Sequence, residues 1–321
     1  MSASFPSARR ILADLAQQYT GKVTTPEMLQ AVAAGASGRS IMRVHGLMAI
    51  HWTGARADNN SFLPAAHGLA AAGIRVPSIL AEITLPNGCG ACLTEDLGHT
   101  DILSLKNAPE PQKRVAYRQA IDTLLPFWEL SPDWELQPAF DAGLYRWEQE
   151  YFAQHFLGKH LQKQPNEFLC NPALQEMADW LDSLPRVPVH RDCQSQNIML
   201  KDGKAWLIDF QGMRMGRAEY DIASLLYDPY MELNTGMRNE LLDRLNAQLS
   251  NPVDANVLSA CAMQRLMQAL GAFANIGHNM GKRWYLAQIP AALTALRRVI
   301  ELTPADSPAY AAAACLHHAI K

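Results

Sequence analysis

The sequence predicts an α+β fold of two lobes, a small β-rich N-terminal lobe and a large helical C-terminal lobe. Short strand-like segments separated by turn residues fill residues 35–98. Helical patterns dominate from residue 99 onward, and one ribbon of short strands at residues 187–210 interrupts them. We therefore expect an N-terminal lobe over residues 1–98 and a C-terminal lobe over residues 99–321, joined through a hinge at residues 95–98.

The N-terminal lobe is expected to begin with a helix and to continue as a sheet that contains one further helix. Gly73 supplies a C-cap signal for that second helix, and Pro77 interrupts the extended segment that follows it. The expected elements are a helix over residues 1 to about 30, strands at 41–44 and 47–52, a helix at 60–72, an extended segment at 75–84, and a strand at 91–94.

The ribbon carries the most informative motif of the chain. Its residues read His190-Arg-Asp-Cys-Gln-Ser-Gln-Asn197, followed by Ile208-Asp-Phe210. Strands at 187–190, 197–200 and 205–210 surround an Asp-Gly hairpin turn at residues 202–203. That register places Asn197 opposite Ile208, next to Asp209. Kinase-like folds use this spacing for a catalytic base, here Asp192, and for two oxygen ligands of Mg²⁺, here Asn197 and Asp209.

These motifs identify a family resemblance that covers nearly the whole chain. The chain resembles the aminoglycoside-phosphotransferase-like kinases, which have a bilobal protein-kinase-like fold. Within them it is most similar to the bacterial anomeric kinases of N-acetylmuramate and N-acetylglucosamine. The matching segments are Leu93-Thr-Glu-Asp-Leu-Gly98, His190 to Asn197, Ile208-Asp-Phe-Gln211, Tyr220-Asp-Ile-Ala-Ser-Leu-Leu226, and the C-terminal residues Gln264-Arg265, Leu270-Gly271, Phe273, Gly281-Lys282 and Tyr285-Leu286.

The resemblance implies an ATP- and Mg²⁺-dependent kinase that acts on a small sugar during cell-wall recycling. It implies that Glu95 and Leu97 offer backbone groups to adenine, and that Glu148 and Arg265 bind the sugar. It also implies that Asp221 holds the backbone of the loop at residues 190–197 through buried hydrogen bonds.

One position departs from the pattern of many kinases. Ala49-Ile-His-Trp52 lacks the lysine that commonly binds the phosphates of ATP on this strand. His51, Arg39 and Arg43 are the candidates to replace it, and arginine offers a bidentate fork to phosphate oxygens. A Gly-x-x-Gly turn at residues 35–38 is a further candidate, through its backbone N–H groups.

Several alternatives stay open at this point. Trp128, Trp134, Trp284 and Tyr285 are either core residues or rings that stack on a sugar. The acceptor is alternatively an aminoglycoside or an amino alcohol. The missing lysine also permits a nucleotide-binding pseudokinase that acts as a partner module.

Composition excludes other classes of protein. The net charge of −3 and the pI of about 6.4 argue against a nucleic-acid partner. Residues 99–321 hold 21 basic and 25 acidic side chains, which is weak acidity for the binding of a polycation. No apolar run reaches the roughly 18 residues of a membrane span. The six scattered cysteines fit reduced thiols. We therefore expect a soluble, cytoplasmic protein.

Overall fold

The computed structural model describes residues 7–32 and 38–321, which form two compact units. The first unit runs to Thr100 and also takes in residues 132–137 and 199–212. The second unit holds residues 101–131, 138–198 and 213–321. Residues 208–210, which we assigned to the C-terminal lobe, thus belong to the first unit.

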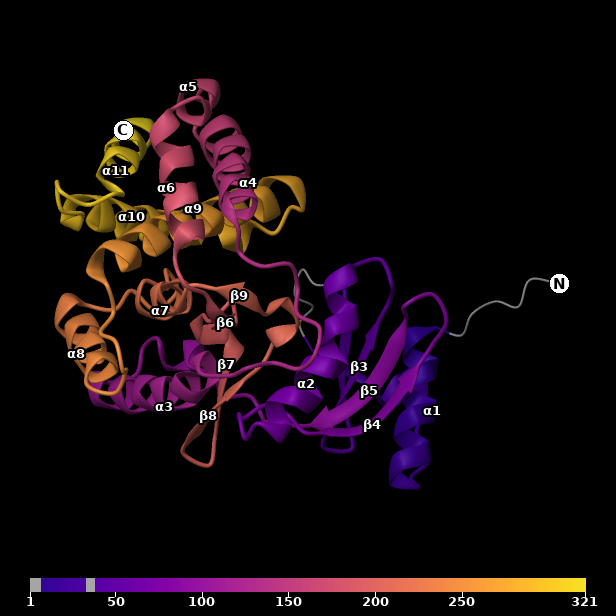
Figure 1. The fold of residues 1–321 in the computed structure, drawn as a ribbon. Helices are drawn as coiled ribbons and strands as arrows, with labels where there is room; N and C mark the ends of the chain where they lie inside the picture. The colour runs from indigo at the N-terminus through magenta and orange to yellow at the C-terminus, as the bar shows by residue number, and fades with distance from the viewer. Residues whose placement is uncertain (1–6, 33–37) are drawn as a thin grey trace. The chain divides into compact units, whose positions relative to one another are not determined.

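The first unit is built on a five-stranded antiparallel sheet (Figure 1). The strand order is β1-β2-β3-β5-β4. Ser40 pairs with His51 across the first two long strands, and Ile50 pairs with Cys92 on the other side. The strands are β1 (Gln30–Ala31), β2 (Ser40–Val44), β3 (Leu47–Trp52), β4 (Ile79–Thr84) and β5 (Gly90–Glu95).

Helix α1 (Ala8–Thr20) packs against β3, β4 and β5. Ser7 caps its N-terminus by accepting a hydrogen bond from the Arg10 amide. The expectation of a helix to about residue 30 is wrong beyond Thr20, because Gly21 adopts a left-handed φ of 68° and ends the helix. Its buried face joins the sheet in one hydrophobic core, with residues Leu12, Leu15, Met42, Val44 and Leu93.

The first unit also contains α2 (Phe62–Ala71) and a β-hairpin. The hairpin joins β7 (Ile198–Lys201) to β8 (Lys204–Leu207). Asp202 and Gly203 have φ angles of 52° and 70°, which is the signature of the two-residue type I′ turn that the sequence predicts. The hairpin is fastened to the rest of the unit by Arg75, whose Nε donates to the Ala205 carbonyl at 2.9 Å.

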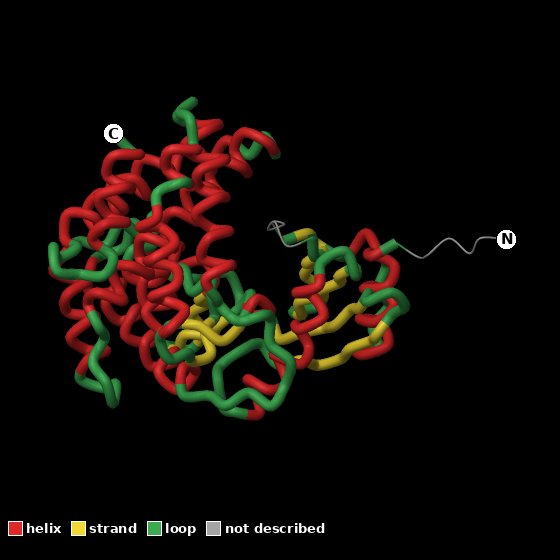
Figure 2. Tube along the Cα trace, turned by 45° about the horizontal axis from the view of Figure 1, so that its top comes forward, coloured by secondary structure: helices red, strands yellow, loops and turns green. Residues whose placement is uncertain are grey.

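The second unit is mostly helical (Figure 2). Its long helix α9 packs against α4, α7 and α10, and almost every residue of its middle is buried. Residues 153–160 continue α4 as a π-helix. The helices are α3 (Glu110–Trp128), α4 (Ala142–Phe152), α5 (Asn166–Leu169), α6 (Pro172–Ser183), α7 (Ala218–Leu226), α8 (Thr235–Asn246), α9 (Ala255–Asn279), α10 (Ile289–Leu302) and α11 (Tyr310–Ala319).

A two-stranded antiparallel sheet inside this unit positions the motif loop. It pairs β6 (Val187–Val189) with β9 (Arg214–Gly216). The loop at residues 190–197 leaves the end of β6 directly, so its first residue is fixed by a buried strand. The sequence analysis missed β9, because three residues carry too little periodicity to be recognised.

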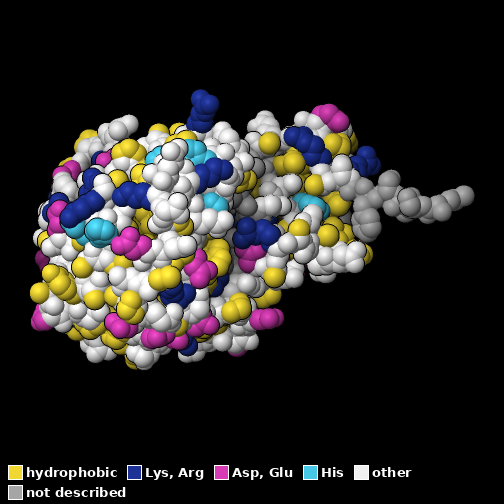
Figure 3. Space-filling view, turned by 90° about the horizontal axis from the view of Figure 1, so that it is seen from above, with side chains coloured by type: hydrophobic (Ala, Val, Ile, Leu, Met, Phe, Trp, Pro, Cys, Tyr) yellow, Lys and Arg dark blue, Asp and Glu magenta, His cyan; other side chains and the backbone are white. Residues whose placement is uncertain are grey.

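Charged and apolar side chains share the face of the molecule seen in Figure 3. The face in Figure 3 shows basic and acidic side chains together, with apolar ones between them. None of the helices in residues 7–32 and 38–321 combines the length and apolar character that a bilayer span requires. All six cysteines are free thiols.

Candidate active site

The loop at residues 190–197 is held in shape by Asp221 of α7. One carboxylate oxygen accepts the His190 amide at 2.7 Å and the Trp128 indole N–H at 3.1 Å, and the other accepts the Arg191 amide at 2.8 Å. Arg191 has a φ of 76°, which is costly for a non-glycine residue. Asp221 therefore has the structural role that we expected, and it stabilises a strained backbone just before Asp192.

A second buried carboxylate, Asp228, fixes the other end of the loop. Its Oδ2 accepts the Ser195 amide at 2.8 Å, and its Oδ1 accepts the Tyr230 amide at 2.9 Å. The sequence analysis missed this residue. Its one local signal is the Asp-Pro pair that it forms with Pro229, which is typical of a turn.

Asp192 lies half-buried in a strongly positive environment. Its carboxylate is 3.5 Å from the Arg265 guanidinium, and about a third of its side chain is exposed. Burial acts to raise the pKa of Asp192, but the charges of Arg265 and Arg191 outweigh it and hold that pKa below its usual range. The group is therefore an ionised carboxylate that solvent can reach.

Arg265 of α9 also donates to the Gln194 side chain at 3.0 Å. Arg265 thus contacts two residues of the loop, and these contacts orient the Asp192 side chain. Contact of Arg265 with a substrate stays a prediction.

Asn197 is buried at the end of the same loop, in a 3₁₀ helix over Ser195–Asn197. Its Nδ2 donates to the Asp192 carbonyl at 2.9 Å. Because the amide nitrogen is used in this way, the amide oxygen is the atom left to bind a hard cation.

Glu148 of α4 is completely buried. Its Oε1 accepts the Tyr220 hydroxyl at 2.7 Å, and its Oε2 has no hydrogen-bond partner within residues 7–32 and 38–321. Burial raises the pKa of Glu148 to about 7, against the opposing charges of Arg191 and Arg265. Because Glu148 is fully buried, its position favours a structural role in which it holds Tyr220. Direct contact of Glu148 with a sugar stays a prediction.

Arg214 of β9 adds a third guanidinium, which the sequence analysis did not identify. Burial lowers its pKa to about 10, and the charge of Arg191 acts in the same direction. Arg191, Arg214 and Arg265 all lower the pKa of Asp192. This concentration of positive charge disfavours a cationic ligand beside Asp192.

In the first unit, Asp209 forms an ion pair with Arg39. The same oxygen, Oδ1, accepts the Gln211 amide at 3.1 Å. Both contacts use Oδ1, so Oδ2 has no partner among the residues that the structure describes. An open carboxylate oxygen on Asp209 and the amide oxygen of Asn197 are both hard donors that suit Mg²⁺. No group of three or more His, Cys, Asp or Glu side chains within the described ranges is arranged to hold a metal. Binding of Mg²⁺ by Asn197 and Asp209 stays a prediction.

Arg39, one of the candidates to replace the missing lysine, is buried just before the start of β2, and its binding to phosphate stays a prediction. It precedes Ser40, which pairs with His51 of the neighbouring strand. Its guanidinium lies 5.5 Å from the centre of the Phe62 ring, which stacks in turn on Phe210. Burial lowers the pKa of His51, which disfavours the charged imidazole that would attract phosphate.

The hinge residues form a compact charged network. Arg43 donates to both carboxylate oxygens of Asp96, at 2.5 and 3.0 Å, and to the Gly98 carbonyl at 2.9 Å. Glu95 pairs with Lys201 of the hairpin at 2.6 Å, and Leu97 is buried. These contacts assign Arg43 a role in shaping the hinge, and its binding to nucleotide stays a prediction. Gly35 lies outside the described residues, while Gly38 has a φ of 70°.

The structure therefore divides the predicted site residues between the two units. Asp192, Asn197, Glu148 and Arg265 lie together in the second unit, and Arg39, Arg43, Glu95, Leu97 and Asp209 lie in the first.

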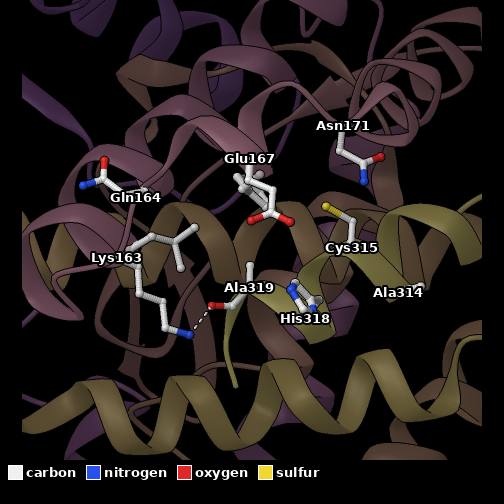
Figure 4. Close-up of a pocket in the computed structure, with 10 residues that line it drawn as sticks. Lys163, Gln164, Glu167, Asn171, Ala314, Cys315, His318 and Ala319 are labelled. Carbon is white, nitrogen blue, oxygen red and sulfur yellow. Dashed lines mark hydrogen bonds between the residues drawn. The ribbon is translucent and has the colours of Figure 1, made fainter.

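A separate pocket lies elsewhere in the second unit, between α5, the segment that precedes it and α11 (Figure 4). Glu167, Cys315 and His318 line it, and Lys163 donates to the Ala319 carbonyl at its edge. None of the predicted site residues lines this pocket.

Comparison with known proteins places this geometry in context. Residues 29–255 match the phosphotransferase enzyme family. An N-acetylmuramate/N-acetylglucosamine kinase of Pseudomonas aeruginosa is 29% identical over 88% of this chain and 87% of its own length. The kinase of the same description from Pseudomonas putida is 30% identical over 76% of this chain and 74% of its own length.

Solved structures share the fold at low identity. A choline/ethanolamine kinase family protein from Mesorhizobium loti has a TM-score of 0.62 at 14% identity, covering 96% of this chain and 98% of that one. The gentamicin complex of APH(2")-IIa has a TM-score of 0.60 at 10% identity, covering 91% of this chain and 97% of that one. The prediction of an α+β, protein-kinase-like fold with a β-rich start and a helical remainder is confirmed.

Proposed function

Because the chain belongs to the phosphotransferase enzyme family, we propose that it is an ATP-dependent kinase of N-acetylated amino sugars. The acceptor atom is the anomeric hydroxyl of N-acetylmuramate or N-acetylglucosamine, and the product is a sugar 1-phosphate that re-enters cell-wall synthesis. The observation that carries this proposal is the 29% identity to an N-acetylmuramate/N-acetylglucosamine kinase across 88% of the chain.

The chemistry around Asp192 supports the proposal. An ionised, partly exposed carboxylate can accept a hydrogen bond from the attacking hydroxyl and take its proton as the new oxygen–phosphorus bond forms. The bond between the γ-phosphorus and the β–γ bridging oxygen breaks, and ADP leaves. An anomeric hydroxyl is more acidic than an ordinary alcohol, so a carboxylate whose pKa is held low is a sufficient base.

The nucleotide side of the reaction falls to residues of both units. Asn197 and Asp209 would hold Mg²⁺, which neutralises charge on the phosphates when bound. Arg39 would contact the triphosphate, because it is buried, permanently charged and adjacent to Asp209. Backbone groups of Glu95 and Leu97 would contact the adenine.

The positive surroundings of Asp192 favour this acceptor over an aminoglycoside or an amino alcohol. Three guanidinium groups act on Asp192, and a cationic acceptor would be repelled where it must bind. A neutral sugar, or one that carries a carboxylate, is not repelled by these groups.

The test is an ADP-release screen with N-acetylmuramate, N-acetylglucosamine, kanamycin and choline. We expect turnover with the two sugars alone. Their methyl glycosides should be inert, and phosphorus NMR of the product should show coupling to H1. Turnover with kanamycin or choline alone would overturn the choice of acceptor. Binding of Mg·ATP without ADP release from any acceptor would favour the pseudokinase alternative.

A further inference from the structure

Trp284 is an exposed aromatic ring on a well-packed base. Just over half of its side chain is exposed, at 53%. Its ring stacks on Tyr230 with centroids 5.5 Å apart and planes 20° apart. Tyr230 is buried and its ring contacts Phe273 of α9. The other tryptophans that the sequence offered for sugar stacking are used elsewhere, because Trp128 is buried against Asp221 and the Trp134 ring packs on Gly68.

The Trp284–Tyr230 stack is fixed with respect to Asp192. Asp228 accepts the amides of both Tyr230 and Ser195, and Ser195 lies three residues after Asp192. One buried carboxylate thus connects the base of the stack to the motif loop. Burial raises the pKa of Tyr230, and the charges of Asp228 and Asp192 act in the same direction, which is consistent with this proximity.

One face of helix α9 extends from Arg265 along the side of the Trp284–Tyr230 stack. Gln268, Ala272 and Ile276 are half-buried positions in a segment that is otherwise mostly buried. They follow Arg265 at intervals of three, four and four residues, so they share its face of the helix. The next positions around the helix, Phe273 and Gly277, contact Tyr230 and Leu286. This half-buried strip of α9 therefore starts at Arg265, the partner of Asp192, and borders the segment that carries Trp284.

The charge near Trp284 restricts what this surface can bind. Lys282 and Arg283, the two residues before Trp284, are both exposed cations. An exposed tryptophan could otherwise hold a quaternary ammonium group through a cation–π contact. Neighbouring cations oppose that ligand, and they favour a neutral ring or one that carries a carboxylate.

We propose that Trp284, supported by Tyr230, is the stacking platform for the apolar face of the acceptor's pyranose ring, and that the acceptor is neutral or anionic. This inference rests on the proposed function, since it assigns the sugar-binding surface of that kinase. Trp284 lies outside the motif loop, and in this proposal it determines which acceptor the protein binds.

The test compares Trp284→Ala and Trp284→Phe with Tyr310→Ala, a control at an aromatic residue of similar exposure at the start of α11. In Trp284→Ala, KM for N-acetylmuramate and N-acetylglucosamine should rise about 10-fold, because a stacking contact of about 1.4 kcal/mol is lost. KM for ATP and kcat should stay within about 2-fold of wild type. Trp284→Phe keeps a ring and should lose less than about 3-fold. Tyr310→Ala should match wild type.

Intrinsic fluorescence gives a second readout that needs no turnover. Either sugar, added without ATP, should change the tryptophan emission of the wild-type protein, and this change should shrink in Trp284→Phe. Wild-type sugar kinetics in Trp284→Ala, with an unchanged Tm, would overturn the platform and leave the proposed function intact. Absence of sugar phosphorylation by the wild-type protein would overturn the proposed function itself. A rise in KM for choline in Trp284→Ala, with choline as the sole acceptor, would overturn the neutral or anionic class.

Discussion

Asp192 and Asp209, the two carboxylates of the motif, are each paired with an arginine from a distant segment, yet their surroundings differ. Asp192 faces three guanidinium groups, and the backbone on both sides of it is fixed by buried carboxylates. Asp209 has one arginine and one amide on a single oxygen, and its other oxygen is open among the described residues. The difference indicates that the proposed base, Asp192, is held by the protein itself, while Asp209, the proposed metal ligand, keeps one carboxylate oxygen available.

Asp192→Asn is the substitution for which we expect the largest loss of activity. The substitution keeps the shape of the side chain and removes its ability to take a proton, so kcat should fall by about 10²–10⁴-fold. Mg·ATP affinity should stay near the wild-type value, because Asp192 acts on the acceptor. Steady-state kinetics and calorimetry measure the two quantities separately. Wild-type turnover in this variant would contradict the assignment of the base.

Asp209→Ala should have the opposite pattern. Loss of the open carboxylate oxygen leaves the charge of a bound triphosphate uncompensated, so the increase in ATP affinity on adding Mg²⁺ should disappear. Calorimetry with and without Mg²⁺ is the measurement. The matched control is Asp202→Ala at the exposed hairpin turn, which should retain the Mg²⁺ effect. Equal Mg·ATP affinity in Asp209→Ala and wild type would show that the cation binds elsewhere.

Variants of Arg39 and His51 test which of these two residues contacts the phosphates of ATP. Arg39→Ala should raise KM for ATP by about 10–100-fold, which corresponds to the loss of one hydrogen bond to a charged group. His51→Gln should change KM for ATP by less than about 3-fold, because burial lowers the pKa of His51 and so disfavours its charged form. Initial rates at varied ATP with saturating acceptor distinguish the two. A larger effect at His51 would reverse the assignment.

Glu148 tests the effect of burial on a carboxyl near Asp192. Because its pKa is raised to about 7 in the folded protein, Glu148 stays protonated there while the unfolded chain has released that proton. Stability should therefore fall as pH rises from about 4.5 to about 7, with a contribution of up to about 1.4 kcal/mol per pH unit. Glu148→Gln should remove that part of the slope. Urea unfolding at pH 5 and pH 7 compares the two proteins. An unchanged slope would place the pKa of Glu148 near its ordinary value.

Much of the fold was predictable because local signals agree with it. The Asp202-Gly203 turn fixed the hairpin, and Gly73 appears just after α2 with the expected left-handed φ. The first helix was overestimated because Gly21, a clear stop signal, was not weighed. The short strand β9 places Arg214 opposite Val189 at the end of β6. A strand of three residues has too short a pattern for its pairing to be predicted from the sequence.

The hairpin and the loop that carry the motif residues were predictable from the spacing of these residues, while the roles of the residues stay predictions. The partners of these residues were not predictable. Arg265 pairs with Asp192 across 73 positions of sequence, and Arg39 pairs with Asp209 across 170. Asp228 reads locally as a turn residue, and only the folded chain shows that it holds two amides. Contacts of this range depend on tertiary packing, which a single sequence does not display.

The shared carboxylate of Asp228 has a thermodynamic consequence. Its two oxygens join the Ser195 amide and the Tyr230 amide, so order on either side stabilises the other. Coupling of this kind is reciprocal: a ligand that steadies Tyr230 steadies the loop, and a steady loop raises the affinity for that ligand by the same factor. If the acceptor stacks on Trp284 as proposed, this one buried side chain would couple acceptor binding to the order of the motif loop.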